Sequence, residues 1–148
     1  MARAVGIGLP VSFKHGVEIC NFIKNKSVND AKKMLKGVVD KKVAVPFRRY
    51  NWDLGHKRKI GPGRYPEKAS KHFIQLIEAV EANAQFKGLN TANLLIAHVA
   101  VHKSRKAWHY GRKSRRQMKR SNVEIVVEEK SKKEEKTKSK ESKEVKKE

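Results

Sequence analysis

Hydrophobic residues follow a helical period most clearly over residues 66–87. Pro66 is favoured at a first helical position, and the acid at Glu67 suits the positive end of the helix dipole. Gly88 provides a stop, because glycine readily adopts the left-handed conformation. We predict a helix over 66–87 that forms the main core element. Its apolar stripe consists of Ala69, Phe73, Leu76, Ile77, Val80 and Ala84.

Two shorter helices are predicted before it. In 13–24, Ser12 is a candidate N-cap, and Asn25 can end the helix because Asn tolerates the left-handed conformation. Its apolar face is predicted from Phe13, Val17, Cys20 and, less regularly, Phe22 and Ile23. In 28–39, Ser27 followed by Asp30 resembles a capping box. The second apolar stripe consists of Ala31, Met34, Leu35 and Val38.

Strand-like runs lie near both ends of the chain. Residues 1–11 show no period and predict a short arm or an edge strand. The branched run 94–101 and the alternating run 123–129 predict a β-hairpin over 94–129. Its tip, 103–120, reads KSRKAWHYGRKSRRQMKR, with nine Lys/Arg and no acid. A polyanion would supply the missing counter-charge, so we expect the rest of the chain to hold this tip out into nucleic acid.

Periodicity disappears over residues 41–65. Five Gly and Pro residues in this stretch predict neither a long helix nor a central strand. Aromatic residues alternate here with Arg and Lys, a composition that suits stacking on bases and salt bridges to phosphates. The alternative is that the aromatics pin the loop to the core, a role that suits Phe47 as well as base stacking does and suits Trp52 less.

Composition bounds the class of protein. The chain has 148 residues, a formal net charge of +21 and a pI near 10.3. We predict one domain over 1–129, which carries most of the excess charge, and a disordered charged tail over 130–148. The single cysteine, Cys20, is expected in the core, which fits a reducing compartment. No apolar run approaches the roughly 18 residues of a membrane span, and no signal peptide is evident, so we expect a soluble intracellular protein without a membrane partner.

Catalytic and cofactor signatures are missing. One cysteine cannot form a zinc pattern with the histidines, and no Gly-rich loop leads from a strand into a helix. We therefore predict no enzyme activity, no cofactor and no metal. No heptad pattern appears, so an obligate homo-oligomer is not expected.

Four blocks of sequence, in this order, are informative together: SVNDAKKMLKGVV followed by VPFRRYN, GHKRKIGPGRYP, EANAQFKGLNTANLLIAHVAV, and the basic arm closing with NVEIVVEE. They resemble the archaeal form of the L-twenty-two family of large-subunit ribosomal proteins (L-seventeen in the older eukaryotic naming). The resemblance covers most of residues 9–129 and leaves out the tail. The arm here is a few residues shorter than in typical members and lacks their early Gly-Pro pair.

The resemblance implies an α+β fold, with three helices packed on a small antiparallel sheet and a long protruding β-hairpin. It implies a structural constituent of the large subunit that contacts several rRNA domains and supports assembly. Its globular part would lie near the peptide exit tunnel, and its hairpin would line the tunnel wall. Its partners would be large-subunit rRNA, neighbouring ribosomal proteins and the nascent polypeptide, on cytoplasmic ribosomes.

The expected rRNA-binding residues come from the irregular stretch and the hairpin tip. They are Arg48, Arg49, Tyr50, Trp52, His56, Lys57, Arg58, Lys59, Arg64, Lys103, Arg105, Lys106, Trp108, Tyr110, Arg112, Lys113, Arg115, Arg116, Lys119 and Arg120. The resemblance places the tunnel-lining tip at Lys106, Ala107, Trp108, His109, Tyr110, Gly111 and Arg112.

Two other functions are weighed against this one. A DNA-compacting or chromatin-type protein would also use high positive charge and a Lys-rich tail. Aromatics interleaved with Arg in irregular loops suit folded RNA better than a uniform duplex, and no helix-turn-helix pattern appears. An RNA-modifying enzyme is disfavoured because the cofactor loop and the nucleophile are missing.

Overall fold

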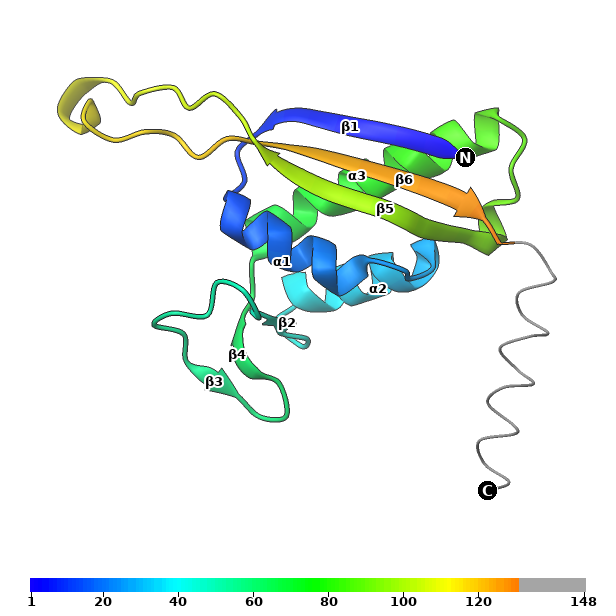
Figure 1. Ribbon diagram of the computed structural model, residues 1–148, viewed down its shortest axis with the longest axis horizontal. Coiled ribbons are helices and arrows are strands. Elements are labelled where there is room, and N and C mark those ends of the chain that lie inside the picture. Colours follow the sequence, from blue (N-terminus) through cyan, green and yellow to red (C-terminus); the bar gives the residue numbers. More distant parts are fainter. Residues whose placement is uncertain (131–148) are drawn as a thin grey trace.

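The fold is one three-stranded antiparallel sheet covered on one face by three helices, as the computed structural model shows for residues 1–130 (Figure 1). The sheet has the order β1-β6-β5. Its strands are β1 (Ala2–Leu9), β5 (Leu94–Lys103) and β6 (Ser121–Glu129). The helices are α1 (Phe13–Ile23), α2 (Val28–Val39) and α3 (Glu67–Phe86). The predicted α+β class is therefore confirmed, and β1 is the edge strand that residues 1–11 suggested.

Helix α3 is the central core element, as its stripe predicts. Phe73 and Val80 are fully buried, whereas Leu76 is only partly buried and packs near Gly6 of β1. Pro66 lies one position earlier than predicted: it is the N-cap residue, and the first helical residue is Glu67. At the other end Gly88 has a φ of +72°, which confirms it as the stop.

Helix α1 follows its predicted range, and its predicted face is right only in part. Cys20 and Ile23 are buried as predicted, but Phe13 and Val17 are only partly buried, and the unpredicted Ile19 is fully buried. Ser12 is the N-cap residue, as predicted, but its side chain makes no capping hydrogen bond. Asn25 has a φ of 59°, which confirms the left-handed residue just beyond the helix.

Helix α2 begins with the predicted capping interaction. The Ser27 hydroxyl accepts a hydrogen bond from the Asp30 N–H at 3.1 Å and donates one to the Asp30 carboxylate at 2.8 Å. This satisfies one amide that the first helical turn leaves unpaired. An ion pair between Lys32 and Glu81 then joins α2 to α3.

The core lies between the helices and the inner face of the sheet. Strand β6 alternates strictly, with Val123, Ile125 and Val127 fully buried. Strand β5 carries an irregularity between Ile96 and His98, which explains why its apolar run did not alternate in sequence.

The irregular stretch contains a second, smaller sheet of order β2-β4-β3. Its strands are β2 (Val45–Pro46), β3 (His56–Lys57) and β4 (Gly61–Arg64). The prediction that Gly and Pro forbid a central strand here is wrong. The partners of β4 are staggered, because β3 pairs with Gly61 and Pro62 while β2 pairs with Gly63 and Arg64. Pro62 only has to accept a hydrogen bond, from the Phe47 N–H at 2.9 Å, so its missing N–H costs nothing.

The hairpin ladder runs from Leu94, opposite Glu129, to Lys103, opposite Ser121. Beyond it the chain projects from the end of the sheet as a long loop (Figure 1). Residues 131–148 of the predicted tail lie outside the described residues. No helix within residues 1–130 is long and apolar enough to cross a membrane.

Candidate nucleic-acid interface

The projecting loop, residues 104–120, is the basic arm. Three cross-arm backbone hydrogen bonds join its two sides: Ser104 N–H to Arg120 O at 3.3 Å, Met118 N–H to Ala107 O at 2.8 Å, and His109 N–H to Arg116 O at 2.8 Å. A short 3₁₀ turn over Gly111–Lys113 closes the tip, and Gly111 has a φ of +62°. The arm is therefore a loosely paired loop rather than a continuation of the β-ladder.

The arm presents its side chains to solvent. Trp108 is 61% exposed and Tyr110 is 87% exposed. None of the salt bridges within residues 1–130 involves the arm. The exposed cations of the arm are Arg105, Lys106, Arg112, Lys113, Arg115, Arg116 and Lys119.

The second predicted group lies in residues 48–64, the basic loop, whose start is held by a buried carboxylate. Glu18 of α1 is 1% exposed and accepts three backbone hydrogen bonds. The donors are the N–H groups of Arg48 at 3.1 Å, Arg49 at 2.9 Å and Tyr50 at 2.9 Å. Backbone donors satisfy the buried charge, so the Arg48 and Arg49 side chains stay exposed on an anchored main chain.

Aromatic rings fix the basic loop further. Tyr50 meets Phe13 edge-to-face at 6.4 Å between ring centroids, and the Lys14 and Arg49 cations lie 5.7 and 5.6 Å from the Tyr50 ring centroid. Phe47 is buried, as the core-pinning alternative expected, while Trp52 is 87% exposed. Trp52 is therefore available for stacking, as predicted, and Phe47 is not.

The rest of the basic loop is a small exposed hairpin. His56 and Lys57 form β3, and Arg58 and Lys59 follow them at the turn into β4. Lys59 has a φ of 66°, and the Lys57 cation lies 5.5 Å from the Tyr65 ring centroid. These cations face solvent on a backbone that the smaller sheet supports.

The structure brings the two basic groups together at the N-terminus of α1. Burial, and then the nearby charges of Arg64 and Lys119, hold the pKa of the His15 imidazole below its ordinary value. His15 also packs edge-to-face on Phe47 at 5.6 Å between ring centroids. Arg64 belongs to the basic loop and Lys119 to the arm, so His15 lies between the two groups.

Glu18 and His15 were not among the predicted site residues. The signal for Glu18 is a lone acid between apolar residues on a helix that ends in the core. Its partners are thirty or more positions away, so no local pattern could name them. The predicted core role of Cys20 is confirmed: it is 6% exposed, and burial raises its pKa to about 12, which leaves the thiol protonated and unreactive.

The described residues offer no metal site, since residues 1–130 hold no cluster of three potential His, Cys, Asp or Glu ligands. The surface is instead exposed cations and aromatics on one anchored loop and one projecting arm. The fold and this surface are those of a nucleic-acid-binding protein.

Comparison with known proteins gives the family. The family model described as "Ribosomal protein L22p/L17e" matches residues 4–128. The chain is 41% identical to the large ribosomal subunit protein uL22 of Archaeoglobus fulgidus over 135 residues, covering 86% of this chain and 87% of the relative. It is 42% identical to the uL22 protein of Methanoculleus marisnigri over 135 residues (86% and 88%), and 46% identical to that of Thermoplasma volcanium over 104 residues (70% and 70%).

The chain belongs to the L22p/L17e family of ribosomal proteins. As a member it is a structural constituent of the large ribosomal subunit in the cytoplasm, with rRNA and other ribosomal proteins as partners, and it is not an enzyme. The predicted resemblance is thereby confirmed.

Proposed function

We propose that this protein binds large-subunit rRNA through two separate surfaces, the basic loop and the basic arm, and that the arm lines the wall of the peptide exit tunnel. The arm carries the proposal. The arm projects beyond the sheet (Figure 1), and it carries seven exposed Lys and Arg residues and no acid. Such a segment gains most of its interaction energy from phosphates and counterion release.

The basic loop contributes the second surface. Its start is held by Glu18, so Arg48, Arg49 and Trp52 are presented without a large ordering cost on binding. Exposed aromatics beside Arg suit unpaired RNA bases, which duplex DNA does not offer. Contacts from both surfaces would join separate rRNA segments, which is how the protein would support subunit assembly.

The tip of the arm is the part assigned to the tunnel wall. Lys106–Arg112 runs along the outgoing side of the arm into the 3₁₀ turn that closes it, and it contains Trp108, His109 and Tyr110. The nascent polypeptide is then a partner of these residues. The globular part would lie near the tunnel exit. One copy of the chain would be enough there, and no homo-oligomer would be required.

Sedimentation with large subunits tests the general proposal. The full chain should co-sediment with large subunits at moderate salt, whereas a DNA-compacting protein would prefer duplex DNA in competition. Free protein should also bind rRNA fragments with an affinity that falls steeply as salt rises. A flat salt response, or a preference for duplex DNA, would contradict the proposal.

Crosslinking tests the tunnel assignment separately. A photoreactive side chain at Tyr110, which is 87% exposed on the arm, should crosslink to a stalled nascent chain inside assembled large subunits. The matched control is the same group at Phe86, which is 95% exposed at the end of α3. Equal crosslinking from both positions, or none from Tyr110, would remove the arm from the tunnel wall.

A further inference from the structure

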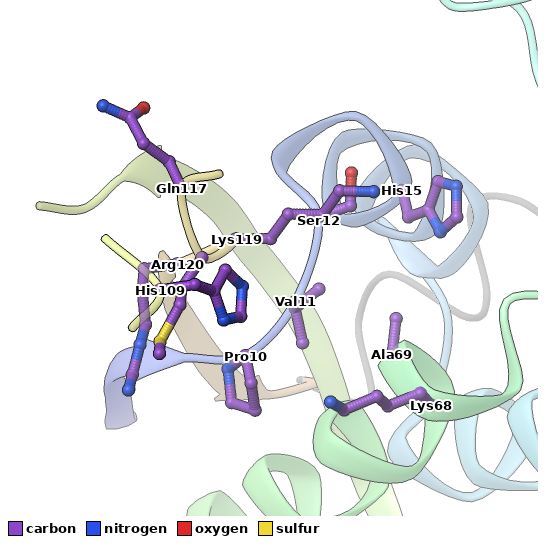
Figure 2. Close-up of a pocket in the computed structure, with 11 residues that line it drawn as sticks. Pro10, Val11, Ser12, His15, Lys68, Ala69, His109, Gln117, Lys119 and Arg120 are labelled. Carbon is purple, nitrogen blue, oxygen red and sulfur yellow. The ribbon is translucent and has the colours of Figure 1, made fainter. Parts of the chain in front are cut away.

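Two neighbouring cavities lie where the arm leaves the domain, and they share Ser12, His15 and Lys119 in their walls. The larger has a volume of about 580 Å³ and lies between the arm, the N-terminal segment and the start of α3 (Figure 2). The smaller, of about 290 Å³, opens toward the basic loop. Together they form a cleft between the two basic surfaces, which we call the root cleft.

Cations from four separate elements surround the root cleft. Lys14 comes from α1, Arg64 from β4, Lys68 from α3 and Lys119 from the arm. No acid lines either cavity, and none of these four side chains belongs to a salt bridge within residues 1–130. Converging cations without a counter-charge create a positive potential that an anion would relieve.

The wall on the arm side is anchored. The Arg120 guanidinium donates a hydrogen bond to Gly8 O at 2.7 Å, and the Ser121 hydroxyl donates one to Val11 O at 3.0 Å. Figure 2 shows Lys119 and His109 on this wall, facing the segment that carries Val11 and His15. The arm is thus loosely held along its length but fixed at its root, so the cleft exists before any ligand arrives.

The two cavities share the wall formed by Ser12, His15 and Lys119, and they differ in the kind of side chain that lines the rest of each cavity. The larger has an apolar lining from Pro10, Val11, Ala69 and Met118. The smaller is lined by the aromatic residues Phe47, Tyr50 and Trp52. Surfaces of these two kinds receive the faces of unpaired bases, while a phosphate suits the cationic wall between them.

We propose that the root cleft binds a single-stranded segment of RNA, with a backbone phosphate between His15, Arg64 and Lys119 and the flanking bases in the two cavities. This deepens the proposed function and rests on it. A helical duplex does not fit the assignment, because its bases are stacked inside and cannot enter separate cavities.

The position of His15 predicts a proton linkage. In the free protein the groups that face it are the cations Arg64 of the smaller sheet and Lys119 of the arm, the ring of Phe47, and its neighbour Lys14 on α1. A bound phosphate would counter these cations and favour the imidazolium. RNA binding should therefore take up a proton, and affinity should increase as the pH falls from about 7.5 to 5.5.

Fluorescence of Trp52 provides the direct test. Replacing Trp108 by Phe leaves Trp52 as the sole tryptophan, in the wall of the smaller cavity. The full-length protein is titrated with an unstructured single-stranded oligouridylate and with an RNA duplex of equal length. We expect the single strand, and not the duplex, to quench Trp52 emission.

Charge variants of this Trp108→Phe protein locate the binding. Arg64→Gln with Lys119→Gln should weaken oligouridylate binding at least about tenfold more than Lys33→Gln with Lys36→Gln, a control pair on α2 that removes the same charge. His15→Gln should reduce the pH dependence of binding. Three results would each contradict binding of RNA in the root cleft. They are equal losses of affinity from the two charge pairs, equal quenching of Trp52 emission by the duplex and the single strand, and a pH dependence that His15→Gln leaves unchanged.

Failure of the root cleft can be distinguished from failure of the proposed function. If only the root cleft is wrong, the protein will still co-sediment with large subunits and bind rRNA fragments with steep salt dependence. If the protein neither co-sediments with large subunits nor binds rRNA fragments with steep salt dependence, the proposed function itself is wrong.

Discussion

The two basic surfaces of this protein both expose Lys and Arg side chains, but they differ in how firmly the rest of the protein holds their backbone. The basic loop is held from inside the domain: a buried carboxylate accepts three backbone amides, and a ring pair and two cation–π contacts fix Tyr50. The basic arm has three cross-arm backbone hydrogen bonds and an exposed tip. The loop is organised by the protein itself, whereas under the proposed function RNA would supply the counter-charge and packing that the arm lacks.

This difference separates stability from binding. A change to the arm should alter RNA affinity and leave folding alone, because the arm contributes no residue to the hydrophobic core. A change to the anchor of the loop should alter folding first and binding as a consequence. The variants below test that separation, from the largest expected effect to the smallest.

Removing the arm should give the largest effect. Replacing residues 105–119 by Asn-Gly would close the ladder after the Ser104–Arg120 pair with a two-residue turn suited to the strand twist. Seven Lys and Arg residues disappear, so the slope of log affinity against log salt should become shallower by up to about 5–6 units. The free energy of unfolding should change by less than about 1 kcal/mol.

Two outcomes would contradict this. Unfolding of the shortened protein under conditions where the parent is folded would show that the arm belongs to the core. An unchanged salt slope would place the RNA footprint on the basic loop alone. A melting curve and a salt titration with the same rRNA fragment distinguish them.

Removing the anchor of the loop should give the next largest effect. Glu18→Ala leaves three N–H groups at 48–50 without their acceptor and should lower the free energy of unfolding by about 2–4 kcal/mol. Glu78→Ala, an exposed acid on α3, is the matched control and should change it by less than about 0.5 kcal/mol. Chemical denaturation measures both, and equal values would mean that Glu18 is not an anchor.

The exposed tryptophans should give smaller effects of a different pattern. Trp52→Ala and Trp108→Ala should each weaken binding to single-stranded RNA by about 1–3 kcal/mol, and Phe86→Ala should not. Double-mutant cycles can combine each tryptophan variant with Glu18→Ala. The losses of binding free energy should be non-additive for Trp52→Ala, because Glu18 holds the loop that carries Trp52, and additive for Trp108→Ala. Non-additive losses for Trp108→Ala and additive losses for Trp52→Ala would contradict the claim that Glu18 anchors the loop and not the arm.

The same contrast explains what the sequence could and could not predict. Local rules placed the elements correctly: the Ser27–Asp30 cap, the Asn25 and Gly88 terminations, and the stripe of α3 depend only on neighbouring residues. The arm could also be predicted, because a segment rich in cations and without an acid is recognised from its composition alone.

The anchored loop could not be predicted in the same way. No local pattern marks Glu18 as an anchor, since its partners lie in another element, and part of the buried face of α1 was missed for the same reason. The staggered pairing that allows Pro62 in a central strand also depends on two separate partners. The root cleft joins four elements, and only the fold could bring Arg64 and Lys119 to His15.

Amide hydrogen exchange of the full chain, free and bound to an rRNA fragment, tests the central claim most directly. In the free protein the amides of Arg48, Arg49 and Tyr50 should exchange slowly, because Glu18 accepts them in the interior, and most amides of residues 105–117 should exchange fast. RNA should slow exchange strongly in the arm and little at these three amides. Slow exchange in the free arm, or fast exchange at 48–50, would contradict the account.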